Sequence, residues 1–173
     1  VAKSEVARWP VLGWLAASAG TLFLKRDRKS DVLRIGKALP PLIDDGVVVA
    51  VFPEGTSTNG RSVLFFKSSL LAPAVEHGWP SAPVWIGYAL DDGSVETEVC
   101  YWGDLTFVPH FLKLLSKEAI CARVVYGPAI QGATHRKQLA RLLHDQVCGM
   151  ANAFGYRRHD KTGWRRPSPG LHG

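Results

Sequence analysis

The amino-acid sequence predicts an α/β fold in which a mainly parallel sheet is covered by helices on both faces. Short β-branched runs alternate with longer amphipathic segments, as expected for strands that are connected by helices. The clearest run, residues 47–52, is apolar at every position, which is typical of a strand buried on both faces. The chain has 173 residues, 46% of them hydrophobic, and this is enough for one domain with a real core.

The first half of the chain contains the parallel strands of this prediction. We expect the end of a strand at 1–4, a helix near 8–18, a strand at 20–25, a helix at 31–44, a strand at 47–52 and a helix near 62–76. Asp31 is a suitable N-cap for the helix at 31–44, although Pro40 and Pro41 should kink or shorten it. Pro73 should bend the helix near 62–76.

The second half is expected to continue the alternation. Its elements are strands at 82–90 and about 97–103, a short helix near 107–116, a strand at 119–127 and a helix from Thr134 to about Phe154. The turn Asp91-Asp92-Gly93 predicts a hairpin, so the late strands are expected to run antiparallel. Residues 1–154 form the predicted domain, and residues 155–173 form a basic tail that we expect to be disordered.

Charge is unevenly distributed along the chain. The net charge is +6, and the tail contributes +4 of it through Arg157, Arg158, Lys161, Arg165 and Arg166 against Asp160. The remaining body is therefore only weakly basic, and we expect no nucleic-acid partner. The tail is either a solvated terminus or a segment that holds the protein near an anionic membrane surface.

The sequence contains no pattern of a metal or nucleotide site. Cys100, Cys121 and Cys148 have no Cys-x-x-Cys spacing and are interpreted as buried thiols in a reducing compartment. There is no His-Glu-x-x-His and no Walker motif, so we expect neither a metal nor a bound cofactor.

Residues 9–24 carry no charge, and they are short for a membrane span. One interpretation is a buried helix that leads into a strand. The other is an apolar surface against acyl chains or the bilayer, because Trp9 and Trp14 suit an interface and a basic cluster begins at Lys25.

A rigid turn follows the apolar run at 47–52. Pro53 fixes its φ angle, Gly55 lets the backbone approach a ligand, and Thr56 and Ser57 can donate hydrogen bonds to a phosphate or carbonyl oxygen. Open parallel sheets bind ligands at the carboxyl ends of their strands, where this turn is expected to lie. The turn is either a ligand-binding loop or an ordinary strand-to-helix connection.

Several short blocks occur in an ordered series. They are Val1-Ala2-Lys3, Trp9-Pro10-x-x-Gly13, the segment from Gly20 to Arg26, Phe52-Pro53-Glu54-Gly55-Thr56, Gly60-Arg61, Phe66-Lys67 and Ala82-Pro83-Val84. Together they resemble the glycerophospholipid acyltransferase family, the lysophosphatidate acyltransferases, from Val1 to about Tyr126. The resemblance implies an enzyme that transfers a fatty acyl chain from acyl-CoA or acyl-carrier protein to lysophosphatidate.

The catalytic base of this family and its partner lie in a His-x-x-x-x-Asp motif, which the resemblance places before Lys3. None of the six histidines is followed by an aspartate at that spacing. His110 is interpreted as a helix-surface or core histidine rather than a catalytic one. We therefore expect a fragment that lacks the catalytic pair and is inactive alone, whereas the intact protein works at the cytoplasmic face of the membrane, peripherally or through preceding residues.

The resemblance also implies which cations bind the acceptor. Arg26 is the first choice as a phosphate ligand, because a guanidinium can bind phosphate oxygens bidentately. Alternatively, Arg26 is a surface residue in a charged cluster. Lys3 resembles a family lysine that also serves the phosphate. Lys67 is expected on a helix face with apolar neighbours, where it either reaches water or meets an anion.

The loop itself would form the acceptor cradle. Glu54 would accept hydrogen bonds from acceptor hydroxyls or hold loop amides. Gly55, Thr56 and Ser57 would shape and line the cradle. Many family members have arginine where Ser57 stands, so one phosphate cation is missing, and Arg61 is close enough in sequence to compensate. Such variants are similar to bacterial relatives that acylate lyso-ornithine lipids as well as lysophosphatidate. The alternatives are thus a lyso-ornithine lipid acyltransferase and a noncatalytic phosphate- or lipid-binding module.

Overall fold

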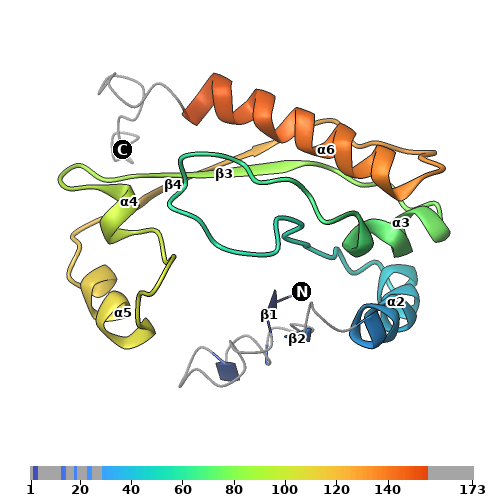
Figure 1. The fold of residues 1–173 in the computed structure, drawn as a ribbon, viewed down its shortest axis with the longest axis horizontal. Coiled ribbons are helices and arrows are strands. Elements are labelled where there is room, and N and C mark those ends of the chain that lie inside the picture. The colour runs from blue at the N-terminus through green and yellow to red at the C-terminus, as the bar shows by residue number, and fades with distance from the viewer. Residues whose placement is uncertain (1, 4–12, 15–17, 19–22, 25–28, 156–173) are drawn as a thin grey trace, which may run out of the picture. The chain divides into compact units, whose positions relative to one another are not determined.

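The computed structural model describes residues 2–3, 13–14, 18, 23–24 and 29–155 (Figure 1). The chain divides into two compact units. The first unit comprises Val1–Thr56, Leu64–Ser81 and Ala129–His144. The second unit comprises Ser57–Val63, Ala82–Pro128 and Asp145–Gly173. The predicted boundary between the domain and its tail lies at the edge of the described residues and stays a prediction.

Two separate two-stranded sheets are present in the described part of the chain. In the first unit β1 (Ala2–Lys3) pairs in parallel with β2 (Phe23–Leu24). In the second unit β3 (Val84–Ala89) runs antiparallel to β4 (Cys121–Tyr126), as the long paired ribbon of Figure 1 shows. The α/β character is thus present, but a mainly parallel sheet covered on both faces is not confirmed.

Helix α2 (Lys29–Asp44) confirms the helix that was predicted from Asp31 to Asp44. Pro40 and Pro41 lie inside it and do not end it. The helix ends at Asp44, and Gly46 follows with a φ of +82°, which is readily accessible only to glycine. The N–H of Gly46 donates to Ile43 and that of Val47 donates to Leu42, each at 2.9 Å, which is the Schellman pattern of a helix end.

Residues 47–52 were predicted to form a strand, and this prediction was wrong. The segment has no regular secondary structure, Val48 is 94% exposed and Phe52 is 60% exposed. A strand requires a neighbour that accepts and donates its backbone hydrogen bonds. Among the described residues no strand pairs with this segment.

The helix predicted near 62–76 begins later than expected. A loop continues to Lys67, and only then do the 3₁₀ helix η2 (Ser68–Leu71) and helix α3 (Ala72–Glu76) follow. Pro73 does not bend a long helix, because it lies in the first turn of α3, where its missing N–H leaves no helical hydrogen bond unmade. The late start leaves residues 53–67 free to form the loop described below.

The core of the first unit lies between η2, α3 and the first half of helix α6 (Arg136–Met150). Leu71, Leu139, Ala140 and Leu143 are buried together, and Phe66 packs at their edge. The spacing of 139, 140 and 143 places one face of α6 against this cluster. A smaller cluster surrounds Leu39 of α2 and includes Ile43, Val49, Leu70 and Trp79.

In the second unit the strand predicted at about 97–103 was wrong, because its first two residues belong to a short helix and residues 99–103 have no regular secondary structure. Helix α4 (Val95–Glu98) begins after Ser94, and the Glu98 carboxylate accepts a hydrogen bond from the Ser94 N–H at 2.7 Å. This contact holds the first turn of α4, so no hairpin forms at Asp91-Asp92-Gly93. The late strands do run antiparallel, but β3 pairs with β4 instead. The hydrogen bond from Lys117 and that from Ser94 lower the pKa of Glu98.

The remaining helices agree with the sequence prediction. Helix α5 spans Phe107–Leu115, and α6 continues into the π-helical turn η3 (Ala151–Gly155). Of the helix expected near 8–18, Gly13, Trp14 and Ser18 are helical, and the rest lies outside the described residues. None of the helices in the described part of the chain combines the length and the apolarity that a membrane span needs.

Candidate functional site

In the first unit, two backbone hydrogen bonds close the Gly-Thr turn. The Gly55 N–H donates to the carbonyl of Phe52 at 3.2 Å, and the Lys67 N–H donates to the carbonyl of Pro53 at 2.8 Å. Gly55 is buried and has a φ of +78°. A residue with a side chain would be strained in this conformation, so the turn requires the glycine.

Lys67 lies over this turn. A Cβ atom added at Gly55 would stand 2.8 Å from Cε and 2.9 Å from Nζ of Lys67, so the lysine side chain occupies the space that glycine leaves. Lys67 itself has an extended backbone before η2, not the helical one that was predicted, because the helix begins only at Ser68. The structure therefore places the ammonium group directly beside the turn.

Glu54 ties the two ends of the loop together. Its Oε2 atom accepts a hydrogen bond from the Leu64 N–H at 2.7 Å, across ten residues of sequence. A carboxylate that accepts from a backbone amide makes a charge-assisted bond, which is stronger than a neutral one. Glu54 thus holds a loop amide, which is one of the two uses that its position suggested.

We expect Glu54→Ala to loosen the loop and Glu54→Gln to preserve most of it. The glutamine keeps an oxygen that can accept from Leu64, whereas alanine leaves that amide without its partner, at a cost of about 1–2 kcal/mol in the free energy of unfolding. Urea unfolding of both variants measures this difference. Equal losses for both variants would show that the charge, rather than the hydrogen bond to Leu64, stabilises the loop.

Arg61 belongs to the second unit and forms an ion pair there. Its Nε and Nη2 atoms lie 2.8 and 2.7 Å from Oε2 of Glu96. Asn59 donates from Nδ2 to the other oxygen, Oε1, at 3.0 Å. The cation that was expected to replace the missing arginine at position 57 is therefore already paired with a carboxylate. Sequence reasoning missed Glu96, which follows the predicted hairpin turn and belongs to no motif.

The other predicted site residues come from different parts of the chain. Thr56 and Ser57 are exposed, and Thr56 belongs to the first unit whereas Ser57 belongs to the second. Lys3 is in β1, where the structure describes its backbone, and Arg26 lies outside the described residues. His110 is buried in α5 beside the ring of Tyr101, with ring centroids 5.3 Å apart. No cluster of metal-binding side chains occurs in the part of the chain that the structure describes.

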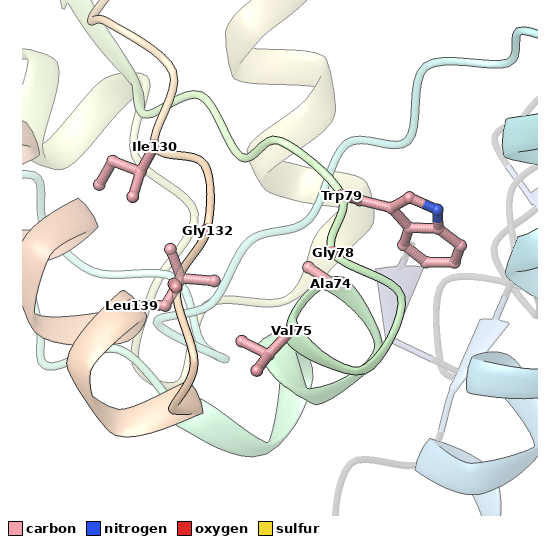
Figure 2. A pocket seen from close by; sticks show the side chains of 8 residues that line it. Ala74, Val75, Gly78, Trp79, Ile130, Gly132 and Leu139 are labelled. Carbon is pink, nitrogen blue, oxygen red and sulfur yellow. The ribbon is translucent and has the colours of Figure 1, made fainter.

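A small apolar hollow lies in the first unit between α3 and the segment that leads into α6 (Figure 2). Val75, Trp79, Ile130 and Leu139 are among its lining residues. Its cavity volume is about 10 Å³, which is room for about one water molecule and far below the ~300–1,000 Å³ of typical ligand pockets. It is therefore a packing defect beside the core rather than a binding site for a lipid chain.

The loop that contains Glu54 and Lys67 lies within a longer segment that matches a known protein family. Residues 1–87 match the family model "Acyltransferase". The chain is 37% identical over 151 residues to a lyso-ornithine lipid O-acyltransferase of Rhodobacter capsulatus, a match that covers 81% of this chain and 53% of that protein. It is 29% identical over 124 residues to a 1-acyl-sn-glycerol-3-phosphate acyltransferase of Neisseria meningitidis, covering 72% and 48% of the two chains.

A solved structure has a similar fold. The 1-acyl-sn-glycerophosphate acyltransferase of Thermotoga maritima matches with a TM-score of 0.57 and 22% sequence identity, over 95% of this chain and 57% of that chain. The chain spans about half the length of the curated relatives that it matches.

Proposed function

Because the chain belongs to the glycerophospholipid acyltransferase family, we propose that the intact protein transfers a fatty acyl group from an acyl thioester to the hydroxyl of a lysolipid. The observation that carries this proposal is the family match over residues 1–87. That range contains the loop of Glu54 and Lys67, which the hydrogen bonds to Leu64 and Pro53 hold in one conformation.

The reaction needs three kinds of group. A general base removes the proton of the acceptor hydroxyl, whose oxygen attacks the thioester carbonyl carbon; the carbon–sulfur bond then breaks and the thiol leaves with a proton. Hydrogen-bond donors stabilise the oxyanion, and cations bind an anionic headgroup. Residues 1–173 contain no His-x-x-x-x-Asp pair, so we propose that they supply acceptor binding and do not turn over alone.

We propose lyso-ornithine lipid as the acceptor, with lysophosphatidate as the second candidate. The relative named for lyso-ornithine lipid matches at the higher identity and over more of the chain. Lys67 lies beside the Gly-Thr turn, but Ser57 supplies no cation and Arg61 is paired with Glu96, and this reduced positive charge supports a headgroup with little net charge. An ornithine headgroup carries one ammonium and one carboxylate, whereas a phosphate monoester carries up to two negative charges.

The donor is proposed to be acyl-CoA or acyl-carrier protein, with no bound cofactor. The transfer is proposed to occur at the cytoplasmic face of the membrane, where the basic residues 157–166 are drawn to anionic lipid. The acyl thioester and the lysolipid would both meet the protein there.

Arg26→Ala tests the acceptor role of the basic segment. A guanidinium binds a phosphate or a carboxylate bidentately, so we expect the KM for the acceptor to rise about tenfold, which corresponds to ~1.4 kcal/mol of lost binding. Initial rates of the intact protein are measured with a labelled acyl thioester, and Arg28→Ala, from the same basic cluster, is the control. An equal effect of both changes would assign Arg26 to the charged surface.

The rival function is a noncatalytic lipid-binding module. Measuring acyl transfer together with vesicle binding separates the two functions. A lipid-binding module binds vesicles that contain the lysolipid without forming labelled product. Turnover by residues 1–173 alone would contradict the assignment of the catalytic pair to another segment.

A further inference from the structure

Glu96 of the second unit binds Asn59 and Arg61 through both of its carboxylate oxygens. Oε1 accepts from Asn59, and Oε2 accepts from Nε of Arg61 and also lies 2.7 Å from its Nη2. The backbone carbonyl of Glu96 accepts a hydrogen bond from the Trp102 indole at 3.1 Å. Glu96 is therefore fixed in place, and it lies beyond residues 1–87, which match the family.

The two partners of this ion pair differ in exposure. The side chain of Arg61 is 67% exposed, whereas that of Glu96 is 20% exposed. The guanidinium is thus within reach of a ligand from solvent, while the carboxylate that neutralises it is mostly covered. A ligand that reaches Arg61 from solvent therefore meets a guanidinium whose charge Glu96 offsets.

We propose that Glu96 determines acceptor specificity, by neutralising Arg61 and so disfavouring a phosphate headgroup relative to a zwitterionic one. The inference rests on the proposed function. A phosphate at Arg61 must approach the carboxylate of Glu96, and like charges repel. The ornithine headgroup brings an ammonium together with its carboxylate, and a pair without net charge does not repel it.

Glu96→Gln tests this proposal in the intact protein. Glutamine keeps the shape and an acceptor oxygen for Asn59 but removes the charge. We expect the ratio of kcat/KM for lysophosphatidate to kcat/KM for lyso-ornithine lipid to rise about fivefold, which is the effect of one unit charge at contact distance in water. Glu118→Gln, an exposed carboxylate of the same unit, is the control for the change in net charge, and it should leave the ratio unchanged.

The double variant Glu96→Gln with Arg61→Gln decides whether Arg61 carries the effect. We expect the gain to disappear in this background, because the two residues act as one unit. An unchanged ratio in Glu96→Gln, or a gain that persists without Arg61, would overturn the proposal.

Vesicle binding separates the failure of this inference from the failure of the proposed function. If the wild-type protein acylates neither lipid, the proposed function fails. If the inference about Glu96 is correct even so, the Glu96→Gln protein binds vesicles containing lysophosphatidate about fivefold more tightly than the wild-type protein does. Without that difference the role of Glu96 in specificity is refuted as well.

Discussion

Gly55→Ala is expected to lower kcat/KM for the acceptor about a hundredfold while the protein stays folded. The added Cβ would meet Cε and Nζ of Lys67 at 2.8 and 2.9 Å, and the lysine side chain must leave the turn. A displacement of about 1 Å in a binding group costs on the order of a hundredfold in rate. The positive φ of +78° adds about 1–2 kcal/mol of strain to the folded state. Initial rates and urea unfolding measure the two effects separately.

Gly46→Ala is the matched control for this prediction. Gly46 has a similar φ of +82°, but a Cβ there would have no heavy atom within 4 Å. Its substitution should therefore cost a similar free energy of unfolding and leave kcat/KM nearly unchanged. If both variants lose activity equally, general destabilisation is responsible, and the contact between Gly55 and Lys67 has no special role.

Leu139→Ala is expected to cause the largest loss of stability, about 2–5 kcal/mol. Leu139 is 1% exposed and packs with Leu71, Ala140 and Leu143 at the centre of the first unit. Truncation removes apolar contacts and leaves a cavity that the surrounding helices fill only in part. The free energy of unfolding, taken from urea titration of the intact protein, is the quantity to measure.

Leu142→Ala provides the control for this substitution. Leu142 lies on the same helix, α6, but it is 42% exposed. Because the change in chemistry and helix propensity is the same, the two variants differ only in burial. A loss for Leu142→Ala as large as that for Leu139→Ala would place the core on the other face of α6.

Elements that depend on local signals were predicted well from the sequence. Helix α2 has its own amphipathic pattern and a glycine at its end, and α5 and α6 also have regular apolar spacing. Strands depend on partners that are distant in sequence, and their prediction was less successful. Residues 47–52 have a strand composition but no paired neighbour in the described part of the chain, and residues 95–98 form a helix because Glu98 binds the Ser94 N–H.

The candidate site shows the same division between local and distant contacts. The sequence indicated the turn at Gly55 and a possible loop-holding role for Glu54, because both follow from residues close to them. It could not indicate that Arg61 pairs with Glu96, 35 residues away, since no spacing rule connects a loop to a helix formed by a different segment. The pairing of Arg61 with Glu96 therefore became visible only in the structure.

The most direct test of the central claim is acyl transfer by the intact protein from a radiolabelled acyl thioester, with lyso-ornithine lipid and lysophosphatidate offered separately. We predict a labelled O-acylated product, with a higher kcat/KM for lyso-ornithine lipid. The absence of labelled product from both acceptors, in a protein that still binds vesicles containing them, would contradict the acyltransferase assignment and support a lipid-binding module.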